Sequence, residues 1–325
     1  MNTWLIILAL IVLFIIIAKT STFGWRFWSK SFTDTEKENT QLMERLKQHV
    51  YTLAHQIGNR NVFKYEALEE AAKYISKEFE SFGYKVEFQD YSVYGKKTSN
   101  IIATKKGGEK SEEIIIIGAH YDTRYSPGAD DNASGVATLL ELARSFSTKN
   151  TNRTVKFIAF VNEERPFFKT KDMGSYVYAR QAHENKENIK AVIALDSIGY
   201  YRNEPNSQRY PPFFGIFYPN KGNFICVAGN FSSKWLIKKI VSIFKKKKYF
   251  PIESFIGPSS VPGVDYSDHW SFWQEGYLSA VVISDTAFYR NPHHHADSDT
   301  YQTLDYKSLA RVCEGLEEVL TDLTK

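Results

Sequence analysis

The amino-acid sequence predicts an α/β fold. Apolar runs typical of strands alternate along the chain with amphipathic, helix-like stretches, and one run contains four successive isoleucines, Ile114 to Ile117. Such an unbroken run indicates a strand that is buried on both faces, as in a sheet covered by helices. The chain has 325 residues, of which 43% are hydrophobic and 24% charged, so it can bury one large core.

The first segment of the chain differs from the rest. It reads TWLIILALIVLFIIIA and ends before Lys19. At about 1.5 Å of rise per residue it covers roughly 24 Å, somewhat less than a hydrocarbon layer of about 30 Å. We expect residues 1–30 to form a membrane anchor with its juxtamembrane segment and residues 31–325 to form one domain. A cleaved signal peptide is the alternative, although the segment lacks a basic start.

Charge and cysteine content exclude several classes of function. The net charge of +4 gives no reason to expect binding to nucleic acid. The longest basic run, residues 245–248, is predicted to be a solvated helix face. Cys226 and Cys313 lack the CxxC spacing of thiolate metal sites and redox motifs, so we expect free thiols, while a pairing in the fold stays open.

The elements after residue 31 follow the hydrophobic periodicity. Helices are predicted over residues 42–57 and 68–82, and further helices are expected to begin near Ser134, Ser175, Trp235 and Leu304. The segment 200–220, rich in Pro, Asn, Tyr and Phe, is predicted to be a long loop, either the wall or lid of a pocket or a plain surface excursion. Strands are predicted over residues 85–91, 100–104, 113–118, 154–161, 190–195 and 280–284.

The strongest functional pattern, GAHYDTRYSPGADDNASG, connects the third predicted strand to a helix. His120 and Asp122 are two residues apart, so on an extended backbone both side chains project to the same side. Asp122 could therefore hold the ring nitrogen of His120 that does not bind a metal. Asp131 lies in a turn rich in Gly, Asp and Asn, where one carboxylate could bridge two cations. The glycines allow the backbone to approach closely.

A pair of adjacent acids, Glu163 and Glu164, ends the buried strand VKFIAFV. Burying two carboxylates is costly unless a cation or a reaction requires them. Because adjacent side chains point in different directions, one acid can bind a metal while the other accepts a proton from a water. The sequence therefore predicts two different roles for the two acids.

Two further candidates also follow strands. Asp196 ends AVIAL, and the segment after AVVIS contains the triplet His293, His294 and His295. Sites in open α/β sheets form at the carboxyl ends of the strands, where these groups would converge. Asp268 is given no role, since a polar loop position suffices for it and its neighbour His269; the side chains of Trp270, Phe272 and Trp273 are expected in the core.

These ordered motifs resemble the co-catalytic zinc exopeptidases of the bacterial leucine aminopeptidase and aminopeptidase Y type. The resemblance begins near residue 59 and covers GAHYD, PGADDNASG, the glutamate pair, ALDSIG, YSDHWSFW and HHHADSDTYQTLDY. It implies a mixed, mostly parallel sheet between helices, of the zinc exopeptidase and phosphorylase/hydrolase-like kind. It also implies that residues 31–325 are the catalytic domain of an aminopeptidase acting on peptides with a free amino terminus.

The resemblance also implies residue roles. One of two Zn²⁺ ions would be held by His120, Asp131 and Asp196, and the other by Asp131, Glu164 and His295. His295 is chosen from the triplet because of its distance from Asp299 and Thr300. Glu163 would be the general base that activates a water between the ions, and Asp122 would orient His120.

Several alternatives remain open at this point. A glutaminyl cyclase with one zinc, a carboxypeptidase, and a receptor-like domain without activity all share this fold. Arg165, where many relatives have a small residue or proline, could bind an acidic group or face solvent. The domain's side of the membrane is unresolved: Lys19, Arg26 and Lys30 place it in the cytoplasm by the positive-inside tendency, whereas the resemblance implies an extracytoplasmic domain.

Overall fold

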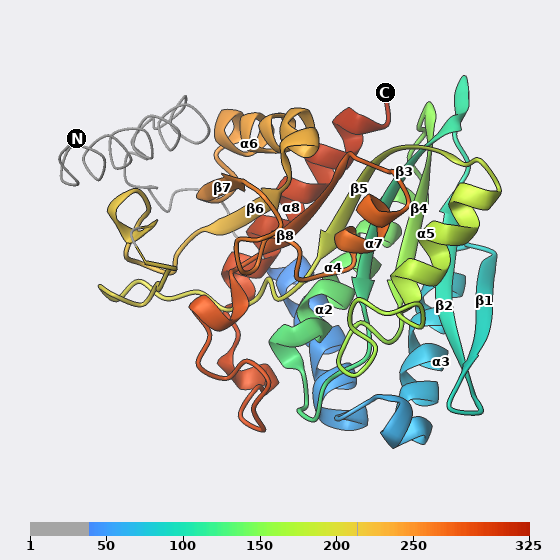
Figure 1. The fold of residues 1–325 in the computed structure, drawn as a ribbon, viewed down its shortest axis with the longest axis horizontal. Helices are drawn as coiled ribbons and strands as arrows, with labels where there is room; N and C mark the ends of the chain where they lie inside the picture. The colour runs from blue at the N-terminus through green and yellow to red at the C-terminus, as the bar shows by residue number, and fades with distance from the viewer. Residues whose placement is uncertain (1–38, 213) are drawn as a thin grey trace, which may run out of the picture.

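The computed structural model describes residues 39–212 and 214–325. Within them an eight-stranded sheet lies between two layers of helices, as Figure 1 shows. The predicted α/β fold with a mixed, mostly parallel sheet is confirmed. In chain order the strands are β1 (Val86–Val93), β2 (Lys96–Lys105), β3 (Lys110–His120), β4 (Arg153–Phe160), β5 (Asn188–Leu195), β6 (Ile225–Gly229), β7 (Ile252–Ile256) and β8 (Ala280–Ser284).

The helices agree closely with the expected positions. The first predicted helix is in fact α2 followed by a wider turn over Thr52–Ile57 that ends at Gly58. The longer helices are α2 (Thr40–Tyr51), α3 (Tyr65–Ser81), α4 (Gly135–Phe146), α5 (Gly174–Glu184), α6 (Lys234–Lys247) and α8 (Tyr306–Leu323), and α7 (His269–Gln274) is short.

The centre of the sheet is parallel. The strand order is β1-β2-β4-β3-β5-β8-β6-β7, and the neighbours β4, β3, β5 and β8 all pair in parallel. The pairings of β1 with β2, β2 with β4 and β6 with β8 are antiparallel. Because the four central strands run the same way, their carboxyl ends lie at one edge of the sheet.

Apolar residues on the two faces of the sheet form two cores. In β3, Ile115 and Ile117 belong to a core that also contains buried residues of α2, α3, α4, α6 and α8, whereas Ile114 and Ile116 belong to the core shared with α5 and α7. Each isoleucine is nearly or fully buried. The four successive isoleucines are therefore a strand buried on both sides, as predicted, since successive side chains point to opposite faces. Phe272 of α7 belongs to the second core.

Two strands escaped the sequence prediction. β6 and β7 have five residues each and extend the sheet beyond β8. They pair in parallel with each other, and α6 lies between them in the chain. The basic residues 245–248 at the end of this helix are exposed, as expected for a solvated face. Cys226 of β6 and Cys313 of α8 are free thiols.

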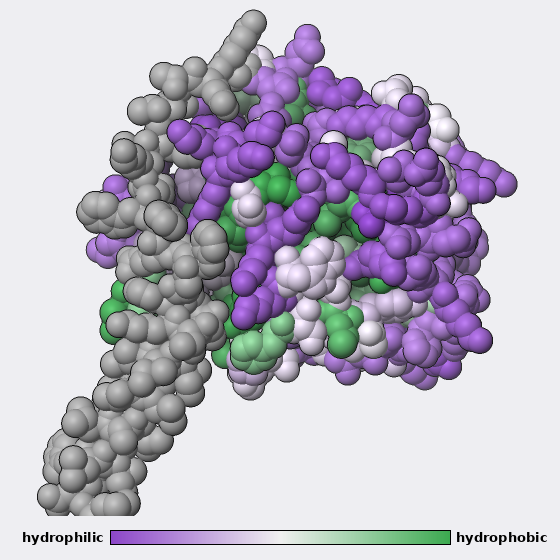
Figure 2. Space-filling model, turned by 90° about the horizontal axis from the view of Figure 1, so that it is seen from above, coloured by the Kyte–Doolittle hydropathy of each residue, from purple (hydrophilic) through white to green (hydrophobic). Residues whose placement is uncertain are grey.

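The predicted membrane anchor, residues 1–30, lies outside the described residues. In the part of the chain that the structure covers, no helix combines the length and apolar character needed to cross a bilayer. Most of the surface seen in Figure 2 is hydrophilic, with apolar side chains in small separate areas. The anchor stays a prediction from the sequence.

Candidate metal centre

Four segments that follow the parallel strands meet at one edge of the sheet. His120 is the last residue of β3, Glu163 and Glu164 follow β4, Asp196 follows β5, and His295 lies in the loop after β8. These strands are immediate neighbours, so residues up to 175 positions apart in the chain become close in space. The edge of the sheet therefore gathers acids and imidazoles, as the strand-end pattern predicted.

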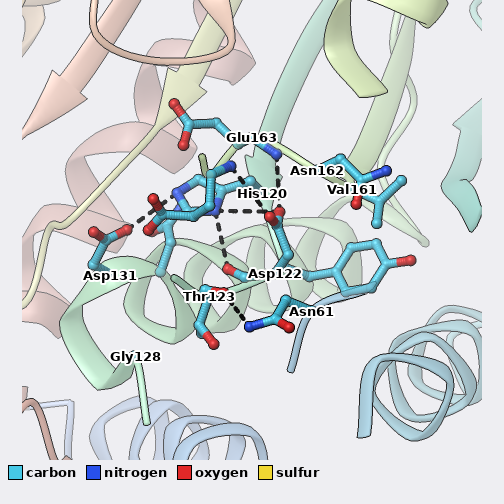
Figure 3. A network of polar contacts seen from close by, with 12 residues as sticks. Asn61, His120, Asp122, Thr123, Gly128, Asp131, Val161, Asn162 and Glu163 are labelled. Carbon is cyan, nitrogen blue, oxygen red and sulfur yellow. Dashed lines mark hydrogen bonds and ion pairs between the residues drawn. The ribbon is translucent and has the colours of Figure 1, made fainter. Parts of the chain in front are cut away.

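Asp131 stands between two histidines. Its Oδ1 atom lies 3.2 Å from Nε2 of His120, and its Oδ2 atom lies 3.1 Å from Nε2 of His295. Nε2 of His120 is also 3.9 Å from Oδ1 of Asp196, and Nε2 of His295 is 3.0 Å from Oε1 of Glu164. Figure 3 shows the His120 side of this arrangement. All five predicted ligands thus come together, with one oxygen of Asp131 facing each subset.

The histidine triplet divides into different environments. Nδ1 of His294 lies 3.2 Å from Oδ2 of Asp131, so it reaches the same oxygen as His295. His293 instead places its Nδ1 2.9 Å from the hydroxyl of Ser298. His295 therefore occupies the expected position, and His294 lies beside it.

The conformation of the turn that carries Asp131 depends on Gly128 and on hydrogen bonds to Asp299. Gly128 has a φ of 61°, and a Cβ there would lie 2.3 Å from the Thr123 side chain and 2.4 Å from the carbonyl oxygen of Asp131. The carboxylate of Asp299 accepts hydrogen bonds from the backbone N–H groups of Asp130 and Asp131, at 3.0 and 3.2 Å. The local sequence thus fixes where the Asp131 side chain points.

Asp122 connects His120 with the glutamate pair. Its two oxygens accept hydrogen bonds from the backbone N–H groups of Glu163 and Glu164. The ring of His120 places Nδ1 3.2 Å from the backbone carbonyl oxygen of Asp122 and 3.7 Å from its carboxylate. The sequence analysis expected the carboxylate to hold the ring, whereas the carbonyl is the closer acceptor. Figure 3 shows Asp122 with dashed lines to His120 and to Glu163.

Arg60 anchors the loop between His120 and Asp131. This arginine is fully buried, and its guanidinium donates hydrogen bonds to the carbonyl oxygens of Tyr121, Pro127 and Gly128. It also donates to carbonyls at the end of the first helical segment, those of Leu53 and Gly58. Burial lowers the pKa of Arg60 to about 10, with nearby acids opposing the shift, so the side chain keeps its charge near neutral pH.

Asn61, next to Arg60, forms hydrogen bonds with the same loop. Its side-chain amide donates to the carbonyl oxygens of Thr123 and Arg124, both at 2.9 Å. Figure 3 shows the contact between Asn61 and Thr123. Arg60 and Asn61 therefore fix the path of the chain between two predicted metal ligands.

The pKa values at the centre reflect crowded, buried acids. Burial and the repulsion of Glu164 raise the pKa of Glu163 well above its ordinary value, against the attraction of His120. Burial and the charge of Asp131 raise the pKa of Glu164 to about 6. Burial alone would lower the pKa of His120, but the carboxylates of Asp122, Asp131 and Asp196 raise it well above 6.5. The acids thus favour a positive charge at this position.

A divalent cation fits this donor set. Nε2 of His120 is buried and has no hydrogen-bond partner among the described residues, although it faces two carboxylates. His120, Asp131 and Asp196 each offer a ligand atom, all within 4.8 Å of one another, and so do Asp131, His294 and His295. Imidazole nitrogens with carboxylate oxygens are the ligands of catalytic zinc sites. The residues present therefore match the expected metal.

A cavity of about 1020 Å³ opens from the centre. Asp131, Glu163 and Asp196 lie on its wall. Tyr210 and Tyr218, from the predicted 200–220 loop, also line it, so this loop is a pocket wall. The other apolar lining residues include Phe168, Phe214, Phe224, Phe255, Val261, Val264, Tyr266, Val282, Phe288 and Tyr289.

Asp268 and His269 are not surface loop residues. Both are fully buried, and His269 begins α7. The two carboxylate oxygens of Asp268 have no hydrogen-bond partner among the described residues. Burial, with the nearby acids Asp196 and Asp122, raises the pKa of Asp268 to about 7, against the attraction of His120. Sequence reasoning missed this acid, and the only available signal was its place in the YSDHWSFW motif.

Comparison with known proteins gives a consistent result. Residues 100–320 match the profile described as "Peptidase family M28". The chain is 36% identical over 325 residues to the uncharacterized protein YfbL of Escherichia coli (strain K12). This alignment covers 97% of this chain and 98% of that protein. It is 28% identical over 240 residues to a probable leucine aminopeptidase 1 of Trichophyton verrucosum, covering 70% of this chain and 58% of that protein.

Solved structures share the fold. A zinc aminopeptidase from Bacillus subtilis superposes with a TM-score of 0.71 at 14% identity, covering 87% of this chain and 95% of that one. A glutaminyl cyclase from Bacteroides thetaiotaomicron superposes with a TM-score of 0.66 at 22% identity, covering 86% and 97%. At these identities the likeness establishes the architecture, which serves more than one reaction.

Proposed function

Because the chain belongs to peptidase family M28, as its motifs suggested, we propose that it is a metal-dependent aminopeptidase that removes N-terminal residues from peptides. The observation that carries the proposal is the double contact of Asp131, with His120 at one carboxylate oxygen and His295 at the other. A carboxylate presented in this way suits a bridge between two cations.

Two zinc ions are proposed, one held by His120, Asp131 and Asp196 and the other by Asp131, Glu164 and His295. When bound, such ions polarise a carbonyl and lower the pKa of water toward neutrality. Glu163 is buried on the cavity wall, and its backbone is held by Asp122. We assign Glu163 the role of general base, which accepts a proton from water and returns it to the leaving amine.

The experiment that tests this function compares Glu163→Gln with Glu184→Gln, an exposed control on α5. We expect the first variant to bind zinc like the wild type but to lose at least about a hundredfold in kcat on aminoacyl amides. The control keeps full activity because its side chain is 60% exposed. Normal turnover in Glu163→Gln, or a wild type without zinc, refutes the assignment.

The cavity indicates the class of substrate. Its wall combines the acids of the centre with many aromatic and aliphatic side chains. Pockets of this kind recognise apolar groups, and a few polar groups set the orientation. We therefore propose a preference for peptides with a large apolar first residue. A panel of amides carrying Leu, Phe, Ala, Glu and Lys tests it, since equal kcat/KM across the panel contradicts the preference.

Two further substrates, a peptide with N-terminal glutamine and a peptide with a blocked amino terminus, separate the other activities of this fold. A glutaminyl cyclase would release ammonia from peptides with N-terminal glutamine without shortening them. A carboxypeptidase would accept peptides with a blocked amino terminus and would need a cation for their carboxylate. Arg165 is exposed on the cavity wall, so it stands where such a cation would be needed. The chain keeps Glu163 beside all five proposed metal ligands. This favours an enzyme over a receptor-like domain without activity.

Attachment to a membrane through residues 1–30 is also proposed, on the apolar sequence before Lys19. The proposed side for the catalytic domain is extracytoplasmic. Fractionation of cells making the full chain tests the first point, and protease accessibility in intact cells or spheroplasts tests the second. Recovery of the uncleaved chain in the soluble fraction contradicts the anchor.

A further inference from the structure

His294 lies at the centre, but neither the sequence motifs nor the proposed function assigns it a role. Its Nδ1 atom lies 3.2 Å from Oδ2 of Asp131, and 17% of its side chain is exposed. The ring also lines the cavity. It therefore lies where both a metal ion and a substrate would be bound.

The backbone brings two neighbouring imidazoles to the same oxygen. Successive side chains of an extended chain point in opposite directions, yet the rings of His294 and His295 are stacked with centroids 3.9 Å apart and planes at 24°. His295 has a φ of 60°, a left-handed conformation that is uncommon outside glycine. Departures of this kind concentrate at functional sites, where the surrounding structure holds them.

The separations suit joint coordination of one ion. Two ligand atoms about 2.0–2.1 Å from a tetrahedral zinc are about 3.3 Å apart. Oδ2 of Asp131 lies 3.2 Å from Nδ1 of His294 and 3.1 Å from Nε2 of His295. The three donor atoms lie within 4.8 Å of one another. Nε2 of His295 also lies 3.0 Å from Oε1 of Glu164, so this nitrogen faces both carboxylates.

We propose that His294 is an additional nitrogen ligand of the second metal ion, beside Asp131, Glu164 and His295. This inference rests on the proposed two-metal function and adds a residue to it. The second ion would then have two imidazole ligands and the first only His120. Because imidazole favours zinc and cobalt over manganese and magnesium, the second position should discriminate between these metals more strongly than the first.

The test uses His294→Gln and His294→Phe in the full chain, with His293→Gln as the matched control. Phenylalanine keeps an aromatic ring beside His295 but has no donor nitrogen, and glutamine keeps a polar group. His293 belongs to the same triplet but contacts Ser298 instead. Zinc affinity is measured by competition with a chelator. Cobalt-loaded protein is examined by NMR for the large, contact-shifted and exchangeable N–H protons of metal-bound imidazole rings.

We expect cobalt-loaded wild type to show shifted protons from three histidines, and both His294 variants to show two. The affinity for the second zinc ion should fall by at least about tenfold in both His294 variants but not in His293→Gln. Signals from only two histidines in the wild type, or unchanged zinc affinities in both His294 variants, overturn the inference while leaving the aminopeptidase proposal intact. A wild type that binds no zinc overturns the proposed function and this inference together.

Discussion

The carboxylate of Asp122 accepts a hydrogen bond from the backbone N–H group of Glu163 at 3.1 Å. Its second oxygen accepts from the N–H group of Glu164 at 3.2 Å. Both contacts bridge the ends of β3 and β4, so one side chain fixes the proposed base and a proposed ligand. Asp122 also contacts His120 through its own carbonyl. Its position therefore controls three parts of the centre.

Replacing Asp122 by Asn tests this role. Asparagine has one acceptor oxygen where aspartate has two, and its NH₂ group cannot accept from a backbone N–H. We expect zinc affinity and kcat/KM each to fall by about tenfold to a hundredfold. Chelator competition and steady-state kinetics measure the two effects. Asp90→Asn, in an exposed ion pair with Lys97, serves as the control, and equal results for both variants contradict the prediction.

Zinc affinity should rise with pH. Nδ1 of His120 lies against a carbonyl oxygen, which only accepts, so this nitrogen keeps its proton. The raised pKa of the ring means that Nε2 is also protonated in the metal-free protein near neutrality. Zinc must displace the proton from Nε2, so affinity should fall about tenfold for each unit that the pH decreases.

The measurement is a competition titration at pH 6, 7 and 8. For the second ion, His295 also releases a proton, since burial would lower its pKa but Asp131 and Glu164 raise it to about 10. Glu164, whose pKa lies at about 6, adds a further released proton at this ion toward the acidic end. Calorimetry in buffers of different ionisation enthalpy counts the released protons independently. Constant affinity across this interval contradicts the proposed ligand role of His120.

The placement of the proposed ligands was predictable because it follows from their positions at the ends of neighbouring strands. A buried parallel strand is recognisable from its apolar run, as in Ile114 to Ile117, and its carboxyl end must lie beside those of its neighbours. His120, Glu164 and Asp196 follow such runs directly. His295 follows β8 by a longer loop, and its assignment came from the resemblance.

The supports of the centre were not predictable in this way. Arg60 contacts Gly128, and Asp299 contacts Asp130, across 68 and 169 positions of the chain. No periodic pattern identifies such pairs, because each is a single polar residue in a loop whose partners are backbone groups. β6 and β7 were not predicted for a different reason. Both are short and only partly buried, and neither has the consecutive β-branched residues by which the equally short β8, AVVIS, is recognisable.

Arg60 should be essential for stability. Methionine at this position fills similar space but removes the guanidinium donor from five buried or partly buried carbonyl groups. We expect Arg60→Met to lower the free energy of unfolding by about 3 kcal/mol or more. Arg60→Lys, which keeps a charge with fewer donors, should lose less. Urea unfolding of the metal-free protein measures both.

The control for Arg60 is Arg180→Met on α5. This side chain is 64% exposed and pairs with Glu184 one turn away, a contact worth well under about 1 kcal/mol. A difference of less than about 1 kcal/mol between Arg60→Met and Arg180→Met shows that the buried guanidinium does not hold the loop.

Gly128 and Gly95 allow a strict comparison of backbone strain and space. Both have left-handed φ angles, 61° and 73°, so alanine should cost each about 1–2 kcal/mol of stability. A Cβ at Gly95 meets nothing within 4 Å, whereas at Gly128 it lies 2.4 Å from the carbonyl oxygen of Asp131. Only Gly128→Ala must displace the turn that aims the proposed bridge. We therefore expect Gly128→Ala to lose more stability than Gly95→Ala in the metal-free state, because only its Cβ meets other atoms. Gly128→Ala should also lose at least about tenfold in zinc affinity, which Gly95→Ala keeps. Equal zinc affinities in the two variants contradict the placement of Asp131 at the metals.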